Sequence, residues 1–233
     1  MKFCIISDLH CKYERDRTSS ETLLFSNMPR KPISQHPVAA MLKAIDDDPL
    51  IKSDALLCLG DLGDKADEQG ITSAWNSIDE IKQKMGAKIR IGVPGNHDVN
   101  SRESFGKDAF TYIKTFHEAF PTIDENLNSL FWGQGYCIYV EHSTLYLLIN
   151  TVHDHSNKEN ALIANLTPTT LEEINGDLND FDMTDVKHKI CMLHHHPLKH
   201  SNIHDYKDSD SLDKGDDLLT TLNTYQFNIV LHG

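Results

Sequence analysis

The sequence predicts an α/β domain, because short apolar runs of strand length alternate with longer segments whose apolar residues recur every three or four positions. Neither a linker rich in Pro, Gly or Ser nor a shift in composition divides the chain, so we expect a single domain over residues 1–233. A chain of this length can bury a substantial hydrophobic core.

The first half of the chain is expected to hold three strands and three helices. The apolar runs at residues 2–7, 55–59 and 87–93 have the length and composition of buried strands. The first helix begins at Pro37, because the missing N–H group of proline is not needed in a first turn. Amphipathic spacing supports this helix, a second helix and a third over residues 107–120, through the apolar positions Val38, Met41, Leu42 and Ile45, then Ile71, Trp75, Ile78, Ile81 and Met85, then Phe110, Ile113, Phe116 and Phe120.

The second half begins with a predicted β-hairpin, in which residues 136–141 and 144–150 flank a short polar step. A helix follows from Thr167-Pro168, then a strand at residues 189–193, a helix marked by Leu218, Leu219 and Leu222, and a final strand at residues 228–231. The stretch 205–217 contains six Asp residues, but Leu212 occupies a position where a calcium loop needs an oxygen ligand. We therefore expect a solvated loop there.

The composition excludes several classes of protein. The formal net charge of −13, from 35 acidic and 22 basic residues, would repel a nucleic-acid backbone, so no bulk nucleic-acid binding is expected. The first apolar run is too short for a signal peptide, and no run approaches the roughly 18 residues of a membrane span. The five cysteines are an odd number and three lie in predicted strands, which favours reduced, mostly buried thiols in a cytoplasmic protein. No pattern indicates an oligomeric state.

Polar side chains gather directly after five of the predicted strands. They are Asp8 and His10, Gly60-Asp61, Gly95-Asn96-His97-Asp98, His194-His195-His196-Pro197 and His232-Gly233. Ligands of open α/β sheets bind beyond the carboxyl ends of the strands, so we expect these residues to converge. Imidazole, carboxylate and amide groups without a CxxC pattern suit Mn, Fe or Zn. A carboxylate can bridge two cations about 3.5–4 Å apart, and Asp61 is the candidate for that role.

The motifs DLH, GDLGD, GNHD and HHHP, in this order, resemble those of the calcineurin-like metallophosphoesterase superfamily from the first strand to the last residue. The resemblance implies a four-layer α/β/β/α sandwich of two mixed sheets flanked by helices. It implies that Asp8 and His10 bind one metal, that Asp61 bridges, and that Asn96 binds a second metal. The histidine two residues before the proline is the usual fourth-motif ligand, which maps to His195, with His194 and His196 as alternatives.

The family's last motif, Gly-His-Xaa-His, supplies one histidine to each metal, and this chain ends at Gly233. We therefore expect a fragment that lacks two ligands and the C-terminal strands after them.

The implied chemistry is hydrolysis of a phosphate ester by a dinuclear metal centre, with a bridging hydroxide as the nucleophile. His97 is the candidate general acid or phosphate-stabilising group, Asp98 is its expected orienting partner, and Asn96 and His97 are expected to contact substrate. Asp64 is equally compatible with orienting a ligand and with a structural role. Five further histidines have no motif context and are expected at the surface, the last two being candidates for substrate contact: His142, His153, His155, His200 and His204.

The substrate is expected to be a phosphate ester, with nucleotides among the candidates. The short first helix and HHHP resemble the phosphodiesterase branch, which includes cyclic-nucleotide enzymes, more than the Ser/Thr protein phosphatase branch. The polar segment 11–35 leaves the site directly and is a candidate lid. The alternatives are a phosphomonoesterase or protein phosphatase of the same superfamily, or a degenerate non-catalytic module that binds a nucleotide or a protein.

Overall fold

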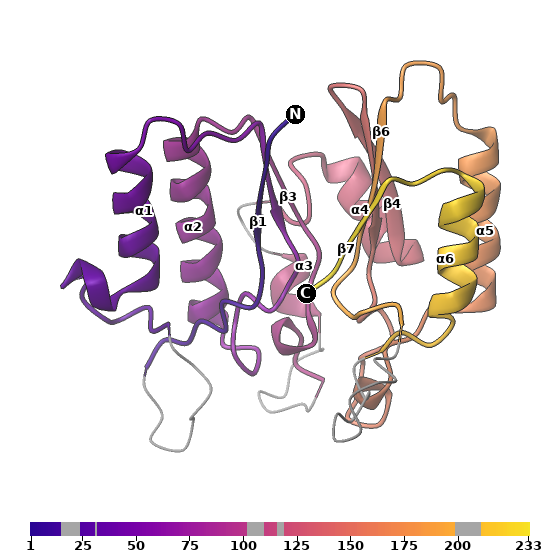
Figure 1. Ribbon diagram of the computed structural model, residues 1–233. Helices are drawn as coiled ribbons and strands as arrows, with labels where there is room; N and C mark the ends of the chain where they lie inside the picture. Colours follow the sequence, from indigo (N-terminus) through magenta and orange to yellow (C-terminus); the bar gives the residue numbers. More distant parts are fainter. Residues whose placement is uncertain (15–23, 31, 102–109, 116–118, 199–210) are drawn as a thin grey trace.

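The computed structural model describes residues 1–14, 24–30, 32–101, 110–115, 119–198 and 211–233. The described residues form four layers (Figure 1). Helices α1 (Pro37–Asp47) and α2 (Glu68–Met85) cover the outer face of one sheet, and α5 (Pro168–Asp180) and α6 (Gly215–Thr224) cover the outer face of a second. The two sheets pack against each other in the middle. The predicted α/β/β/α layering is therefore confirmed.

The first sheet has the strand order β1 (Phe3–Ile6), β2 (Ala55–Cys58), β3 (Ile89–Gly92), and both pairings are parallel. Its register places Ile6 beside Cys58 and Cys58 beside Gly92, so the three strands end at the same level. The helices that connect these strands cross over the sheet, as parallel pairing requires. The polar segments that follow the strands thus leave from one edge.

The second sheet has the order β4 (Tyr136–Glu141), β5 (Thr144–Ile149), β6 (His188–Met192), β7 (Ile229–Leu231). Strands β4 and β5 form the predicted antiparallel hairpin, while β5, β6 and β7 pair in parallel, so this sheet is mixed. The turn residues His142 and Ser143 have φ angles of 49° and 62°. Two positive φ angles are typical of the turn that matches strand twist in a two-residue hairpin.

The core lies mainly between the inner faces of the two sheets. Completely or almost completely buried aliphatic side chains from both sheets meet there, including Leu57, Ile91, Leu148, Ile190 and Met192. Burying one such side chain contributes about 1.5–3 kcal/mol. Two further clusters pack each helical layer onto its own sheet. All five cysteines are free and buried, as expected.

Two helical segments differ from the sequence-based expectation. Within the predicted helix at 107–120, the described helix is only α3 (Thr111–Lys114), and Phe120 lies outside it. Pro121 follows Phe120, and a residue before proline is disfavoured in the helical conformation. Residues 107–109 and 116–118 lie outside the described residues.

Helix α4 (Glu125–Gln134) was not predicted, although it has clear end signals. The side chain of Asp124 caps its N-terminus, and Gly135 ends it with a φ of 85°. Three short 3-10 turns complete the described elements: η1 (Ile33–Gln35), η2 (Asn96–Asp98) and η3 (Asn160–Leu162).

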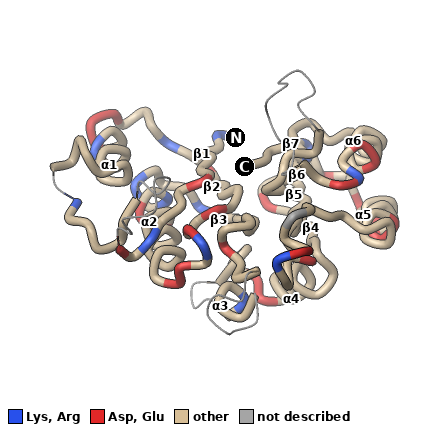
Figure 2. Tube along the Cα trace, turned by 90° about the horizontal axis from the view of Figure 1, so that it is seen from below, with Lys and Arg blue, Asp and Glu red and all other residues tan. Residues whose placement is uncertain are grey.

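The expected solvated loop at 205–217 is described only from residue 211, and its last three residues belong to α6. The candidate lid at 11–35 is described except for residues 15–23 and 31. Among the described residues, no helix combines the length and apolar character needed to span a membrane. Seen from below, acidic and basic residues are interspersed along both halves of the chain (Figure 2).

Candidate metal centre

The polar segments after the strands meet between the carboxyl ends of the two sheets. The segment after β1 runs beside the one after β2, with Asp8 N donating to Gly60 O at 3.1 Å and His10 N donating to Asp61 O at 2.9 Å. The ring of His194, which follows β6, reaches the first sheet, where its Nδ1 lies 2.7 Å from Leu59 O. Residues from both sheets therefore build one site.

The backbone of this site adopts a conformation that costs energy. Asp8, His10 and Asp61 have φ angles of 56°, 42° and 51°, in the left-handed region. Each such residue costs about 1–3 kcal/mol and persists only where its surroundings hold it, which is common at functional sites. The site is also tightly packed, because a Cβ added to Gly95 would lie 2.1 Å from Asp61 Oδ1.

Asp61 occupies the centre of the site and is 3% exposed. Its Oδ1 accepts the backbone N–H of His97 at 2.9 Å. Its Oδ2 lies 3.5 Å from Nε2 of His10 and also 3.5 Å from Nε2 of His194. One carboxylate oxygen thus lies 3.5 Å from two imidazole nitrogens that come from different segments of the chain.

His194 presents a lone pair to other electron-rich atoms. Because Leu59 O can only accept, Nδ1 of His194 carries the proton that is donated to it, and in the neutral ring Nε2 has none. Nε2 lies 3.1 Å from Asn96 Oδ1 and 3.5 Å from Asp61 Oδ2. The neutral ring thus offers a nitrogen lone pair beside an amide oxygen and a carboxylate oxygen, and this donor set fits a metal ion.

Asp8 and His10 also lie close to Asp61. His10 Nε2 lies 3.8 Å from Asp8 Oδ1, and the Ser7 hydroxyl donates to Asp8 Oδ2. Burial alone would raise the pKa of Asp8, but the nearby His10 ring and the Ser7 hydroxyl outweigh it and the pKa is lowered. The interaction with Asp8, more than the charge of Asp61, raises the pKa of His10. Ligand atoms of Asp8, Asp61 and His194 all lie within 4.8 Å of one another.

The structure brings His194, and not His195, to Asp61 and Asn96. The ring of His195 is buried behind His194, with Nδ1 2.8 Å from Thr151 Oγ1. Burial, followed by the neighbouring histidines, holds the pKa of His195 well below its usual range. The family resemblance pointed to His195 because this residue stands two positions before the proline. Sequence position does not specify the direction in which the ring points.

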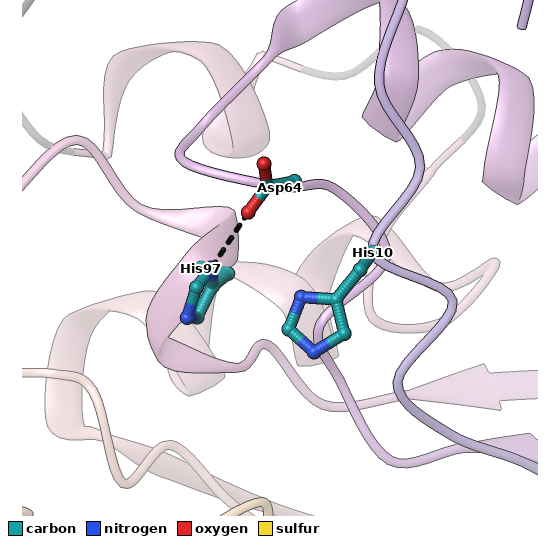
Figure 3. A group of neighbouring side chains, drawn as sticks. All are labelled: His10, Asp64 and His97. Atoms are coloured by element: carbon teal, nitrogen blue, oxygen red, sulfur yellow. Dashed lines mark hydrogen bonds and ion pairs between the residues drawn. The ribbon is translucent and has the colours of Figure 1, made fainter. Parts of the chain in front are cut away.

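His97 and Asp64 form a pair beside His10 (Figure 3). His97 Nδ1 lies 3.2 Å from Asp64 Oδ1, and the His97 ring stands edge-on to the His10 ring with 4.7 Å between centroids. Asp64 is 1% exposed, and Lys12 Nζ lies 3.9 Å from its Oδ2. The His97 side chain is 28% exposed, so its ring is accessible to a substrate while its buried partner is not.

Asp98 does not contact the ring of His97 as the sequence suggested. Its Oδ1 accepts the backbone N–H of Gly63 at 2.9 Å, and its Oδ2 accepts that of Gly95 at 2.9 Å. Burial, together with the charge of Asp61, raises the pKa of Asp98 to about 7. Asp98 therefore joins two loops of the site, and Asp64 has the place beside His97 that was expected for Asp98.

The histidines without motif context have different outcomes. His142 is exposed and pairs with Glu141 at 2.9 Å, and His153 is partly buried. His155 was expected at the surface but is 1% exposed, because its ring packs against His195 and its Nε2 lies 3.2 Å from Ile163 O. The two candidates for substrate contact, His200 and His204, lie outside the described residues.

A family model described as "Calcineurin-like phosphoesterase" matches residues 1–233. No curated protein matches the chain. Among solved structures, the chain is similar to the purple acid phosphatase PPD1 from yellow lupin (Lupinus luteus) seeds, with 14% identity, a TM-score of 0.56, and coverage of 100% of this chain and 37% of the lupin chain. It is also similar to a dimetal phosphatase from Danio rerio, with 11% identity, a TM-score of 0.55, and coverage of 99% and 79%. At these identities the likeness is one of fold.

Proposed function

The chain belongs to the calcineurin-like phosphoesterase family, and from that premise we propose that it is a metal-dependent hydrolase of phosphate esters. One observation carries the proposal: Nε2 of His194 lies 3.1 Å from Oδ1 of Asn96 and 3.5 Å from Oδ2 of Asp61, while its Nδ1 faces Leu59 O. In the neutral ring these are three electron-rich atoms, and a metal cation among them would be attracted to all three.

Two transition-metal ions, Mn, Fe or Zn, would be held on the two sides of Asp61. Asp8 and His10 would hold one ion, and Asn96 and His194 the other, with His194 in the role first considered for His195. The mixed nitrogen and oxygen donors suit these metals. When bound, the ions supply a water of lowered pKa and neutralise charge on the phosphoryl oxygens.

His97 is proposed to donate a proton to the leaving alkoxide. Its partly exposed ring can reach a leaving group, and the Asp64 carboxylate 3.2 Å from Nδ1 sets the orientation of the ring. The backbone N–H of His97 is held by Asp61 Oδ1, so the proton donor is tied to the carboxylate at the centre of the site.

The preferred substrate is proposed to be a phosphodiester, with nucleotides among the candidates. The support is the sequence pattern, which is more similar to the phosphodiesterase branch than to the protein phosphatase branch. Residues 1–233 are proposed to act as one domain, and the five free, buried cysteines support a cytoplasmic location.

Metal analysis and hydrolysis assays on Asp61→Asn test the proposal. Asparagine keeps the shape but removes the charge that both ions would share, so we expect loss of most of the bound metal and of activity. Asp177→Asn is the matched control, because this exposed carboxylate on α5 accepts a hydrogen bond from the Tyr136 hydroxyl and belongs to none of the motifs.

Two aryl substrates separate the possible activities. Faster hydrolysis of bis(p-nitrophenyl) phosphate than of p-nitrophenyl phosphate supports a diesterase, and the reverse order supports a monoesterase. Metal content unchanged in Asp61→Asn would refute the bridging assignment. A metal-loaded protein that hydrolyses neither ester would instead be the non-catalytic binding module.

A further inference from the structure

We propose that Thr151 is a positioning residue for the metal centre, which holds His195 so that the neighbouring His194 points toward Asp61 and Asn96. The inference rests on the proposed function, because it takes His194 to be a metal ligand. The hydrogen bonds of Thr151 go to His195 and not to His194, and no motif of the sequence includes Thr151.

Thr151 lies just after β5 and is 1% exposed. Its hydroxyl oxygen has two partners, both on His195. Oγ1 lies 2.8 Å from the ring Nδ1 and 3.4 Å from the backbone N. A single side chain therefore holds both the ring and the main chain of the residue that follows His194.

The donor and acceptor roles in this contact determine the tautomer of His195. The backbone N–H of His195 can only donate, so it uses a lone pair of Oγ1. Among the residues that the structure describes, the hydroxyl hydrogen has no acceptor other than Nδ1 of His195, and leaving it unpaired in a buried place would be costly. Nδ1 therefore accepts, and Nε2 carries the proton. With one nitrogen bonded to Thr151 and the other protonated, the neutral ring of His195 has no lone pair left for a metal.

The same contact fixes the peptide that links His194 and His195. The carbonyl oxygen of this peptide accepts from Gly233 N at 2.8 Å, and its N–H donates to Thr151 Oγ1 at 3.4 Å. Held on both sides, the peptide cannot rotate freely, and this sets the direction in which the His194 side chain leaves the backbone. The ring then reaches Leu59 O with Nδ1 and presents Nε2 to the site.

Ring packing adds a second restraint. The His195 ring stands nearly perpendicular to that of His194, at 5.0 Å and 79°, and His155 packs on its other side at 5.5 Å and 67°. His155 is itself held by the carbonyl of Ile163 at 3.2 Å. A shift of His195 would therefore move the ring beside the metal ligand.

The test compares three threonine variants for metal binding. Thr151→Val removes the hydroxyl and keeps the branched shape, whereas Thr151→Ser keeps the hydroxyl. Thr144→Val is the matched control, because Thr144 is also fully buried, lies at the other end of β5, and donates its hydroxyl to Met1 Sδ. Affinity for Mn²⁺ and Zn²⁺ is measured by calorimetry against a competing chelator, and thermal unfolding of the metal-free proteins monitors folding.

We expect Thr151→Val to bind the ions about 10–100-fold more weakly, the usual cost of losing a partner that orients a metal ligand. Thr151→Ser should stay within about threefold of wild type, as should Thr144→Val. In the wild-type protein, nitrogen NMR should show Nδ1 of His195 without a proton. This measurement tests the proposal even if Thr151→Val does not fold.

Three results would overturn the inference. The first is a wild-type metal affinity in Thr151→Val. The second is an equal loss of metal affinity in Thr151→Ser and Thr151→Val. The third is a proton on Nδ1 of His195 in the wild-type protein. A wild-type protein that binds no divalent ion would refute the proposed function as well, so the two failures are distinguishable.

Discussion

Gly60 is where the packing of the metal centre can be tested most directly. Its φ is 96°, and a Cβ added to it would lie 2.6 Å from Gly95 N and 2.8 Å from His194 Nδ1. Gly60→Ala therefore has two costs, the strained backbone and the contact with two other segments of the site. Two other glycines separate these costs. Gly86 has a φ of 73° with nothing within 4 Å of an added Cβ, and Gly176 lies inside α5, also with nothing within 4 Å.

The expected magnitudes follow from these geometries. A positive φ costs an alanine about 1–2 kcal/mol, so Gly86→Ala should lower the free energy of unfolding by about that amount. Gly60→Ala should lower it by about 1–3 kcal/mol more, because the crowded atoms belong to the backbone and to a hydrogen-bonded ring. Gly176→Ala should raise the free energy of unfolding by about 0.5–1 kcal/mol, because alanine has the better helix propensity. For a chain of this size, about 3 kcal/mol corresponds to a fall in Tm of about 6–12 °C.

The assay is urea unfolding of the metal-free proteins together with calorimetric metal titration. Gly60→Ala should also weaken metal binding, because both crowded groups belong to the site, whereas Gly86→Ala should not. The reasoning is refuted if Gly60→Ala matches Gly86→Ala in both stability and metal affinity. The atoms around Gly60 would then be able to move aside for the added Cβ at little cost.

Two further predictions concern a histidine proposed as a proton donor and a histidine that caps a helix. His97→Ala should lower turnover by about 10²–10⁴-fold for a diester with an alkyl leaving group, with much less effect on a phenolic one and near-normal metal content. An equal loss on both esters would assign His97 to charge stabilisation. His36 is buried and caps α1 by accepting from Ala39 N at 3.3 Å. Burial, together with Arg30, lowers the pKa of His36, so its contribution to stability is present above the unfolded value near 6.5 and is lost as the pH falls through the lowered value. Tm should therefore fall between pH 7 and pH 5 by more in wild type than in His36→Asn, which keeps a capping oxygen. Parallel pH profiles for the two proteins would exclude this role.

Much of the fold could be predicted because its signals are local. The strand runs at β1 and β2 are continuous and apolar, and α5 begins at a capping Thr167 followed by Pro168. Helix α4 was missed because its apolar residues form only a weak stripe, and Phe131 is its one fully buried side chain. The stretch around Phe110 and Phe120 has helical spacing, but Pro121 prevents the helix from extending through Phe120.

The sequence alone also indicated where the candidate metal centre lies. Asp8, Asp61 and Asn96 each come directly after a strand, and parallel strands of equal register bring their carboxyl ends together. The family resemblance assigned these residues their expected roles, and those roles stay predictions for the metal analysis.

Only the tertiary structure decided the direction of individual side chains. The sequence does not distinguish three successive histidines. In the structure the ring of His194 contacts Leu59 O and lies in the site, whereas the ring of His195 contacts Thr151 and lies behind it. Asp64 and Asp98 were both plausible partners of His97, but the backbone N–H groups of Gly63 and Gly95 occupy both oxygens of Asp98. The sequence specifies which residues directly follow the C-terminal end of a strand. The direction of a ring or a carboxylate depends on hydrogen-bond partners and packing neighbours that other segments contribute only once the chain has folded.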